Sequence, residues 1–205
     1  MAKQITQRTF GMVNGTEIIE TVMENKQGMR VATCTYGATI TEIAVADRAG
    51  VIENVVCGFN SVEGYVAQPQ FFGATIGPFA GRLENSEVVL NGQVIQVEAN
   101  DGAHLLHGGQ DGFHQCIWAV ETSSTENSTT TTYTLTYSGN FPGIMDLVVT
   151  FTLLDSNELI ISYNGRANQD TLLNCTNHSY FNLSGNLKRT VHNHLLKIPA
   201  FFSRI

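Results

Sequence analysis

Apolar side chains recur at every second position along much of this chain, and that spacing favours β-strands over helices. The runs that predict strands lie at residues 40–45, 51–57 (a nearly continuous apolar run), 117–121, 130–137, 147–154 and 158–163. In the fourth run threonines alternate with Tyr133, Leu135 and Tyr137, which is typical of an antiparallel strand with one face in the core. Helical spacing is scarce, and only residues 61–67 predict one short turn of helix. Many short strands at regular intervals predict an antiparallel β-sandwich or a related closed sheet.

Polar segments between these runs predict turns. Asn91 and Gly92 separate two β-rich runs, and this dipeptide is the signature of a type I′ hairpin because both central residues need positive φ. Residues 155–157, Asp-Ser-Asn, predict a second tight turn. The Ser/Thr-rich residues 123–132 predict an exposed loop that leads into a strand.

Composition excludes several classes of protein. Hydrophobic residues make up 42% of the chain, which is enough for a real core. The 11 Lys and Arg against 18 Asp and Glu give a formal net charge of -7, so neither nucleic acid nor an anionic membrane is an expected partner. No internal repeat or break in composition divides the sequence, and we expect one domain over residues 1–205.

The termini and the cysteines bear on the cellular compartment of the protein. The first eleven residues hold no apolar run of the kind that a signal peptide needs, and no stretch reaches the length of a membrane span. The four cysteines are widely spread without a CxxC pair, which indicates free thiols in a cytoplasmic protein. Residues 195–205 are largely apolar, whereas chain ends are usually polar, so we expect a following segment or a partner to cover them.

Three Gly-rich or polar segments interrupt the strand pattern and carry the residues that could take part in catalysis or binding. Residues 73–83 contain Arg82, residues 100–113 contain His107, and residues 174–185 contain His178. Taken singly, each has an ordinary explanation: a surface ion pair, a histidine in a turn, and a structural histidine.

Together these segments resemble the aldose 1-epimerase (galactose mutarotase) family over essentially the whole chain. The most distinctive motifs are Leu-His-Gly-Gly at 106–109 and Thr-Asn-His-Ser-Tyr-Phe-Asn-Leu at 176–183, in the family's order and spacing. The resemblance implies an all-β fold, the large antiparallel sandwich (supersandwich) of galactose mutarotase, with the sugar in an open cleft. It also implies interconversion of the α and β anomers of free hexoses such as galactose and glucose, without a cofactor or a metal.

The resemblance assigns roles to three residues. His178 looks like the general acid that protonates the ring oxygen, a role that suits an imidazole because its pKa lies near the working pH. His107 looks like the second catalytic histidine, which holds and polarises the sugar near the same oxygen. Arg82 looks like the arginine that donates hydrogen bonds to sugar hydroxyls, which a planar fork of fixed charge does well.

The chain also departs from the family pattern. Family members are usually longer, with a glutamate base and a sugar-binding aspartate in their distal part, and no substitute is evident in Glu158, Asp155 or Asp170. We therefore expect an N-terminal portion of the usual fold, with weak or no activity by itself. Pro78 stands where many relatives carry an arginine, but that arginine is not the one matched to Arg82.

Two other functions are consistent with the residues. One is a non-catalytic carbohydrate-binding or vestigial domain that keeps the cleft without turnover. The other is a metal-dependent β-barrel enzyme that would use the cluster of His104, His107 and His114, or the pair His192 and His194, whose side chains share one face of a strand. Outside that hypothesis, the histidines other than His107 and His178 are predicted to be structural or exposed. Four aromatic residues are interpreted as part of the core rather than as side chains that stack on a sugar: Phe79, Phe113, Tyr180 and Phe181.

Overall fold

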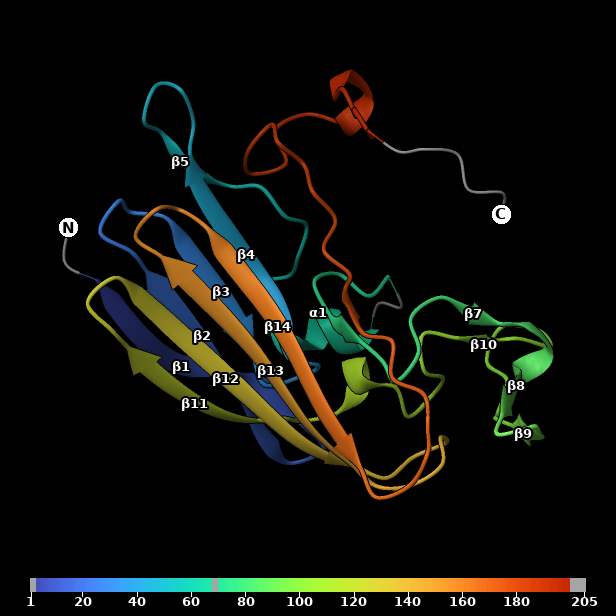
Figure 1. Cartoon of the computed structure of the whole chain (residues 1–205). Helices are drawn as coiled ribbons and strands as arrows, with labels where there is room; N and C mark the ends of the chain where they lie inside the picture. The colour runs from blue at the N-terminus through green and yellow to red at the C-terminus, as the bar shows by residue number, and fades with distance from the viewer. Residues whose placement is uncertain (1–2, 68–69, 200–205) are drawn as a thin grey trace.

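Two antiparallel sheets that share one core form the body of the molecule (Figure 1). This computed structural model describes residues 3–67 and 70–199. The first sheet holds, in chain order, β1 (Gln4–Val13), β2 (Thr16–Glu24), β3 (Arg30–Cys34), β4 (Thr39–Ala46) and β5 (Ile52–Asn54). The second holds, also in chain order, β11 (Ala119–Ser124), β12 (Ser128–Tyr137), β13 (Met145–Leu154) and β14 (Leu159–Ala167). The predicted antiparallel all-β fold is confirmed.

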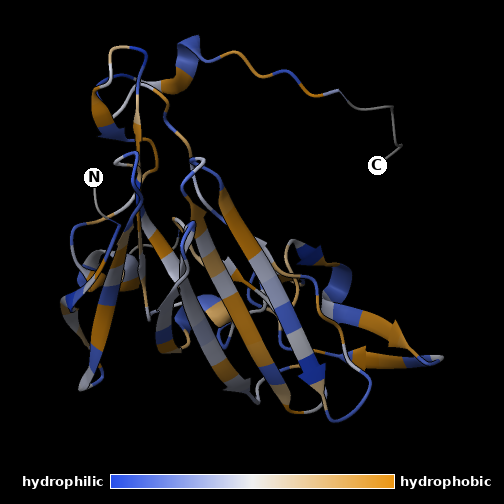
Figure 2. Ribbon diagram, turned by 60° about the vertical axis from the view of Figure 1, so that its left-hand side comes forward, coloured by the Kyte–Doolittle hydropathy of each residue, from blue (hydrophilic) through white to orange (hydrophobic). Residues whose placement is uncertain are grey.

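Strand β13 shows how the alternating sequence builds the core. Its inward side chains are all apolar and buried: Met145, Leu147, Val149, Phe151 and Leu153. Figure 2 shows the same alternation as bands of hydrophobic and more polar residues along the strands. Burial of each such side chain stabilises the fold by about 1.5–3 kcal/mol. Buried Tyr133 of β12 adds a polar link between the sheets, because its Oη donates to Oγ1 of Thr33 in β3 at 2.8 Å.

A buried asparagine joins the two sheets at one end. Asn25, in the turn between β2 and β3, donates through Nδ2 to the Leu154 carbonyl at 2.9 Å and to Asn157 Oδ1 at 2.7 Å. Its Oδ1 accepts the backbone N–H groups of Gln27 and Met29. The predicted turn at residues 155–157 is confirmed, and Asn25 ties it to the first sheet.

The chain between β5 and β11 and the chain after β14 form short ladders and turns beside the sandwich. They comprise α1 (Val62–Ala67), β6 (Thr75–Ile76), β7 (Arg82–Leu83), η1 (Glu84–Ser86), β8 (Glu87–Leu90), β9 (Gln93–Gln96), β10 (Leu105–Leu106), η2 (Phe113–Gln115), β15 (Thr176–Asn177) and η3 (Val191–Asn193). The short helix predicted at residues 61–67 is α1. The predicted hairpin is β8–β9, with φ of 52° at Asn91 and 77° at Gly92.

Two expectations about strands were wrong in extent. Residues 123–132 are not mainly a loop, because all but residues 125–127 belong to paired strands, and Thr129 and Thr131 are buried in the core. The predicted strand at 51–57 pairs with β4 only over Ile52–Asn54. Beyond Asn54, the Val55 N–H still donates to the Ile43 carbonyl at 2.8 Å, and Val56 forms an isolated bridge with Phe181.

The apolar stretch after η3 lies in the open. Leu195, Leu196 and Ile198 are 100%, 85% and 68% exposed, and Figure 2 shows this stretch leading away from the sheets. Residues 200–205 of the predicted apolar end lie outside the described residues. In the described part of the chain no helix is long and apolar enough to cross a membrane. All four cysteines are free.

Candidate functional site

The ladder between β7 and β10 carries both Arg82 and His107. Leu106 pairs with Arg82 in this ladder, so the residue that follows, His107, lies beside Gly81. The His107 backbone N–H donates to the Gly81 carbonyl at 3.0 Å, and the Gly81 N–H donates to His107 Nδ1 at 3.1 Å. His107 itself adopts a left-handed backbone conformation with φ of 55°. Such a conformation is costly for a residue with a Cβ and is often found at functional sites.

The ladder between β6 and β15 carries His178. The His178 N–H donates to the Ala74 carbonyl at 2.9 Å, and the Gly73 N–H donates to the His178 carbonyl at 3.2 Å. Asn177 reinforces this contact, because its Nδ2 donates to the Gly73 carbonyl at 2.8 Å. Its Oδ1 accepts from both the backbone N–H and the hydroxyl of Ser179. The distinctive polar motif is thus the segment that fixes His178 against residues 73–74.

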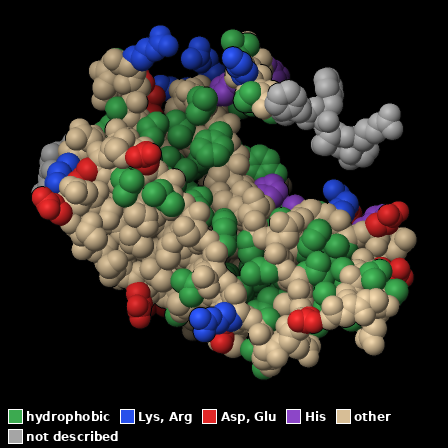
Figure 3. Space-filling view, viewed as in Figure 1, with side chains coloured by type: hydrophobic (Ala, Val, Ile, Leu, Met, Phe, Trp, Pro, Cys, Tyr) green, Lys and Arg blue, Asp and Glu red, His purple; other side chains and the backbone are tan. Residues whose placement is uncertain are grey.

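The two ladders bring His107 and His178 together. Their ring centroids lie 5.0 Å apart with an angle of 81° between the ring planes. Figure 3 shows histidine side chains grouped on the face in view, between the sheets and the β7–β10 ladder. Both imidazoles are half-buried, so they are partly shielded from water yet reachable by a small molecule.

Arg82 lies at the outer edge of this pair. Its Nε donates to Asp101 Oδ2 at 2.7 Å, and 60% of its side chain is exposed. Arg82 also lies near enough to His107 to act on the pKa of that imidazole. The three predicted site residues therefore converge on one place, while the Asp101 contact was not predicted.

A phenylalanine and a third histidine complete the cluster. The Phe71 ring lies 5.0 Å from the ring of His107, 5.6 Å from that of His178 and 4.9 Å from that of His114, between centroids. His114, expected to be structural or exposed, is half-buried and packs on Phe71 in this aromatic group. Tyr180 also lies beside His178, at 5.2 Å. No sequence motif pointed to Phe71, and His114 was named only in the metal hypothesis, because only the approach of separate segments brings these rings together.

Two of these imidazoles are held in the neutral form. Burial, and then the proximity of His178 and Arg82, lowers the pKa of His107 below its usual value. Burial, and then His107 and His178, lowers the pKa of His114 to about 4. Near neutral pH both rings therefore act as neutral hydrogen-bonding groups.

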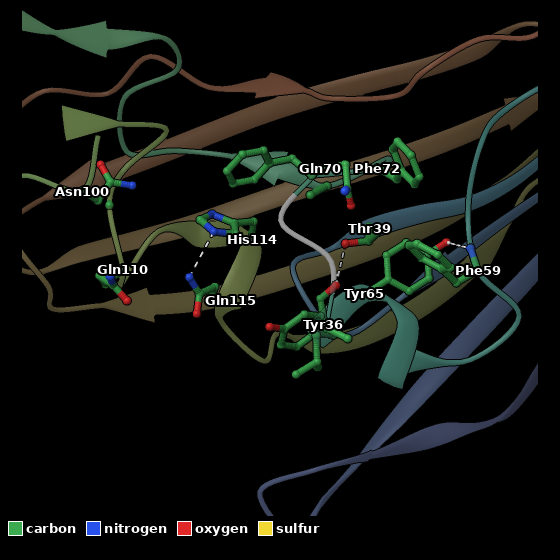
Figure 4. A pocket seen from close by; sticks show the side chains of 15 residues that line it. Tyr36, Thr39, Phe59, Tyr65, Gln70, Phe72, Asn100, Gln110, His114 and Gln115 are labelled. Atoms are coloured by element: carbon green, nitrogen blue, oxygen red, sulfur yellow. Dashed lines mark hydrogen bonds between the residues drawn. The ribbon is translucent and has the colours of Figure 1, made fainter. Parts of the chain in front are cut away.

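A cavity of about 420 Å³ adjoins the cluster (Figure 4). Phe71 and His114 form part of its wall. One end holds Gln110, Gln115 and Asn100 near His114, and the other end holds aromatic side chains (Figure 4). The cavity therefore combines amide and aromatic surfaces directly beside the predicted catalytic residues.

The acidic residues weighed as substitutes for a base are engaged elsewhere. Their partners are Lys26 for Asp155, Asn91 for Asp170 and Ser156 for Glu158. Within residues 3–67 and 70–199, no ion pair joins a carboxylate to His107 or His178.

The histidines considered as metal ligands have other contacts. Nδ1 of His104 accepts the Asn85 N–H at 3.0 Å, and Nε2 of His194 accepts the Leu183 N–H at 2.8 Å. Among the described residues, no group of three or more His, Cys, Asp or Glu side chains is arranged to hold a metal ion.

The chain is similar to known proteins in both sequence and fold. The sequence profile of the family described as Aldose 1-epimerase matches residues 20–203. The chain is 34% identical to galactose mutarotase of Bos taurus over 197 residues, which are 96% of this chain and 57% of that protein. It is 33% identical to aldose 1-epimerase of Haemophilus influenzae over 201 residues, 97% of this chain and 58% of that protein. The crystal structure of galactose 1-epimerase from Lactobacillus acidophilus superposes with a TM-score of 0.80 at 27% identity, covering 88% of this chain and 54% of that one.

The antiparallel sheets and the superposition on galactose 1-epimerase show a galactose mutarotase-like β-sandwich fold. With the profile match over most of its length, the chain belongs to the aldose 1-epimerase family. It spans a little more than half the length of the relatives that it matches.

Proposed function

We propose that this site interconverts the α and β anomers of free aldohexoses such as galactose and glucose. The observation that carries the proposal is the pair of imidazoles, His107 and His178, 5.0 Å apart between ring centroids and bordered by Arg82. Membership of the aldose 1-epimerase family supports it. We further propose one cytoplasmic domain that uses neither a cofactor nor a metal.

Ring opening needs a proton delivered to the ring oxygen while the proton of the C1 hydroxyl is removed. We assign the first step to His178 as general acid, a role worth about 10²–10⁴-fold in rate. His107 donates from Nε2, because its Nδ1 already accepts the Gly81 N–H. It thereby holds the sugar and polarises the ring oxygen. After rotation about the C1–C2 bond, the hydroxyl formed from the ring oxygen attacks the other face of the aldehyde and returns its proton to His178, while the C1 oxygen takes back a proton from the base.

Arg82 is the proposed ligand of sugar hydroxyls. Its Nε is occupied by Asp101, so the two terminal nitrogens of the guanidinium fork stay available for hydroxyl oxygens. By the family resemblance the base is a distal glutamate. We therefore expect the 205-residue polypeptide to bind aldohexoses and to accelerate anomer exchange only weakly by itself.

Polarimetry of freshly dissolved α-D-galactose tests the proposal. The protein should shorten the approach to equilibrium relative to buffer, and His178→Gln should remove about 10²-fold or more of that excess rate. His192→Gln, a change at an exposed histidine outside the cluster, is the matched control and should leave the rate unchanged. If the protein neither accelerates the change nor binds the sugar, the proposal is wrong.

A second candidate function is carbohydrate binding without turnover. It is favoured by one observation, the match of this chain to only 57% of the length of its mammalian relative. Saturable binding of galactose in an NMR titration, with no acceleration by polarimetry, would support this candidate over the first.

A further inference from the structure

Phe71 makes a contact that links the two proposed catalytic imidazoles. Its ring centroid lies 5.0 Å from that of His107, with 77° between the ring planes, and 5.6 Å from that of His178, with 44° between the planes. Among the described residues it is the single aromatic ring that contacts both of these imidazoles. The relative placement of the two histidines therefore depends on Phe71 as well as on their contact with each other.

The two imidazoles are fixed in different ways. Nδ1 of His107 accepts the Gly81 N–H at 3.1 Å, and this bond restricts the plane of that ring. His178 bonds through its backbone, and neither of its ring nitrogens has a hydrogen-bond partner in the described part of the chain. Because rotation about χ2 of a histidine is only weakly restricted by itself, packing must set the plane of this ring. The rings that pack on it are those of His107, Phe71 and Tyr180.

Packing by an aromatic ring suits a general acid. A hydrogen bond from the protein would occupy one of the two ring nitrogens of His178. Contact with Phe71 restricts the ring and leaves both nitrogens available for proton transfer. Tyr180 belongs to the same segment as His178 and is 43% exposed, whereas half-buried Phe71 approaches from a different segment. Phe71 is therefore the better placed of the two to fix the imidazole against the rest of the molecule.

The backbone at Phe71 is held as tightly as its ring. Phe71 has φ of 59°, a left-handed conformation that is costly for a bulky residue and persists only where the surrounding structure imposes it. Its carbonyl accepts the Ala74 N–H at 3.1 Å, and the Ala74 carbonyl accepts the His178 N–H at 2.9 Å. In the same turn the Gly73 carbonyl accepts the N–H of Ile40 in β4 at 2.8 Å. One turn thus fixes both Phe71 and His178 against the first sheet.

We propose that Phe71 is a positioning residue, whose ring holds the imidazole of His178 in the plane from which it transfers a proton to the sugar. The inference rests on the proposed function and adds to it a residue that acts through His178. Loss of the Phe71 ring should therefore lower the rate of anomer exchange and leave the affinity for the sugar unchanged.

The first test measures ring motion in the 205-residue protein without sugar. Phe71→Leu keeps an apolar side chain and a Cβ at the left-handed position but removes the aromatic contact. In ¹³C relaxation of isotope-labelled histidine rings, the order parameter of the His178 ring should fall to the flexible range, below about 0.6. The His107 ring should stay ordered, because Gly81 still bonds its Nδ1. Phe71→Tyr keeps an aromatic ring and should retain the order of His178.

The second test measures anomer exchange and binding separately. A displacement of about 1 Å at a reacting group costs up to about 10²-fold in rate, so Phe71→Leu should lower kcat for galactose by about 10–100-fold in polarimetry. Galactose affinity by NMR titration should change less than about twofold, and Phe71→Tyr should resemble the wild type in both. Phe59→Leu is the matched control, because Phe59 is also half-buried and lines the same cavity but contacts neither imidazole. It should change neither measurement.

The outcomes separate this inference from the proposed function. An ordered His178 ring in Phe71→Leu, or an equal loss of order in both imidazoles, overturns the positioning role. A fall in galactose affinity with an ordered His178 ring would make Phe71 a surface that stacks on the sugar. Unchanged kcat in Phe71→Leu also overturns the positioning role, while anomer exchange by the wild type stands. If the wild type neither binds nor exchanges galactose, the proposed function fails, and the order of the His178 ring alone decides whether Phe71 holds it.

Discussion

The backbone N–H of Gly81 donates a hydrogen bond to Nδ1 of His107 at 3.1 Å. A nitrogen that accepts carries no proton, so the neutral ring must carry its proton on Nε2. Long-range ¹H–¹⁵N NMR correlations should therefore show the Nε2–H tautomer of His107 at neutral pH. A spectrum dominated by the Nδ1–H tautomer would contradict the proposed donation from His107 to the sugar.

The depressed pKa of His114 predicts an acid-sensitive fold. Well above pH 6.5 the ring is neutral in both the folded and the unfolded chain, so this residue contributes no pH dependence there. As the pH falls from 6.5 towards about 4, the unfolded chain binds a proton that the folded chain does not, and stability is lost. For His114 alone, the free energy of unfolding should fall by about 2 kcal/mol between pH 7.5 and pH 5.

Urea titrations at several pH values measure this loss. The variant His114→Gln cannot titrate at this position and should show a shallower decline over the same range. His107, whose pKa is also lowered, should supply part of the slope that remains. Identical slopes for the wild type and His114→Gln would show that burial of His114 does not shift its titration.

Close packing at Gly108 predicts a large cost for a single methyl group. Gly108 has φ of 86°, and a Cβ there would lie 2.0 Å from the Gly77 carbonyl oxygen, so backbone would have to move. Gly108→Ala should lower the free energy of unfolding by at least about 2 kcal/mol and displace the adjoining His107. Gly92→Ala is the matched control, because Gly92 has φ of 77° but nothing within 4 Å of its Cβ position. It should cost about 1–2 kcal/mol by thermal or urea unfolding, and equal costs for the two variants would refute the clash.

The ion pair of Asp101 with Arg82 predicts a modest effect on sugar affinity. Asp101→Asn keeps the shape of the side chain but removes the charge that orients the guanidinium. Exposed ion pairs are worth about 0.2–1 kcal/mol, so galactose affinity should fall about 1.5–5-fold. NMR titration measures it, with Asp170→Asn as a control because that carboxylate accepts from Asn91 instead. Unchanged affinity in Asp101→Asn would mean that Arg82 needs no such orientation.

The second sheet was predictable because its alternating strands and the turn residues between them indicate the same structure. In β13 apolar residues alternate strictly, and the Asp-Ser-Asn turn that follows has the residue types that tight turns need. The first sheet was predicted only from β4 onward. Its opening hairpin has the same Asn-Gly signal, with φ of 49° at Asn14 and 79° at Gly15. That signal was obscured because β1 is a mostly polar and exposed edge strand.

The site was predictable to the extent that single residues sit in distinctive motifs. Arg82, His107 and His178 were named from such segments, and the structure groups them. Phe71 was not named, and His114 was named only as a possible metal ligand, since their contacts depend on how three loops approach each other in space. Local sequence carries no information about such distances.

One short stretch of backbone anchors both imidazoles. Gly73 and Ala74 bond the main chain of His178, while Gly81 bonds both the main chain and the ring of His107. A displacement of this stretch relative to the sandwich would carry the two rings along as a unit. This stretch is itself tied to the first sheet, because the Ile40 N–H donates to the Gly73 carbonyl at 2.8 Å, so the 5.0 Å separation of the two rings depends on how the stretch is held there.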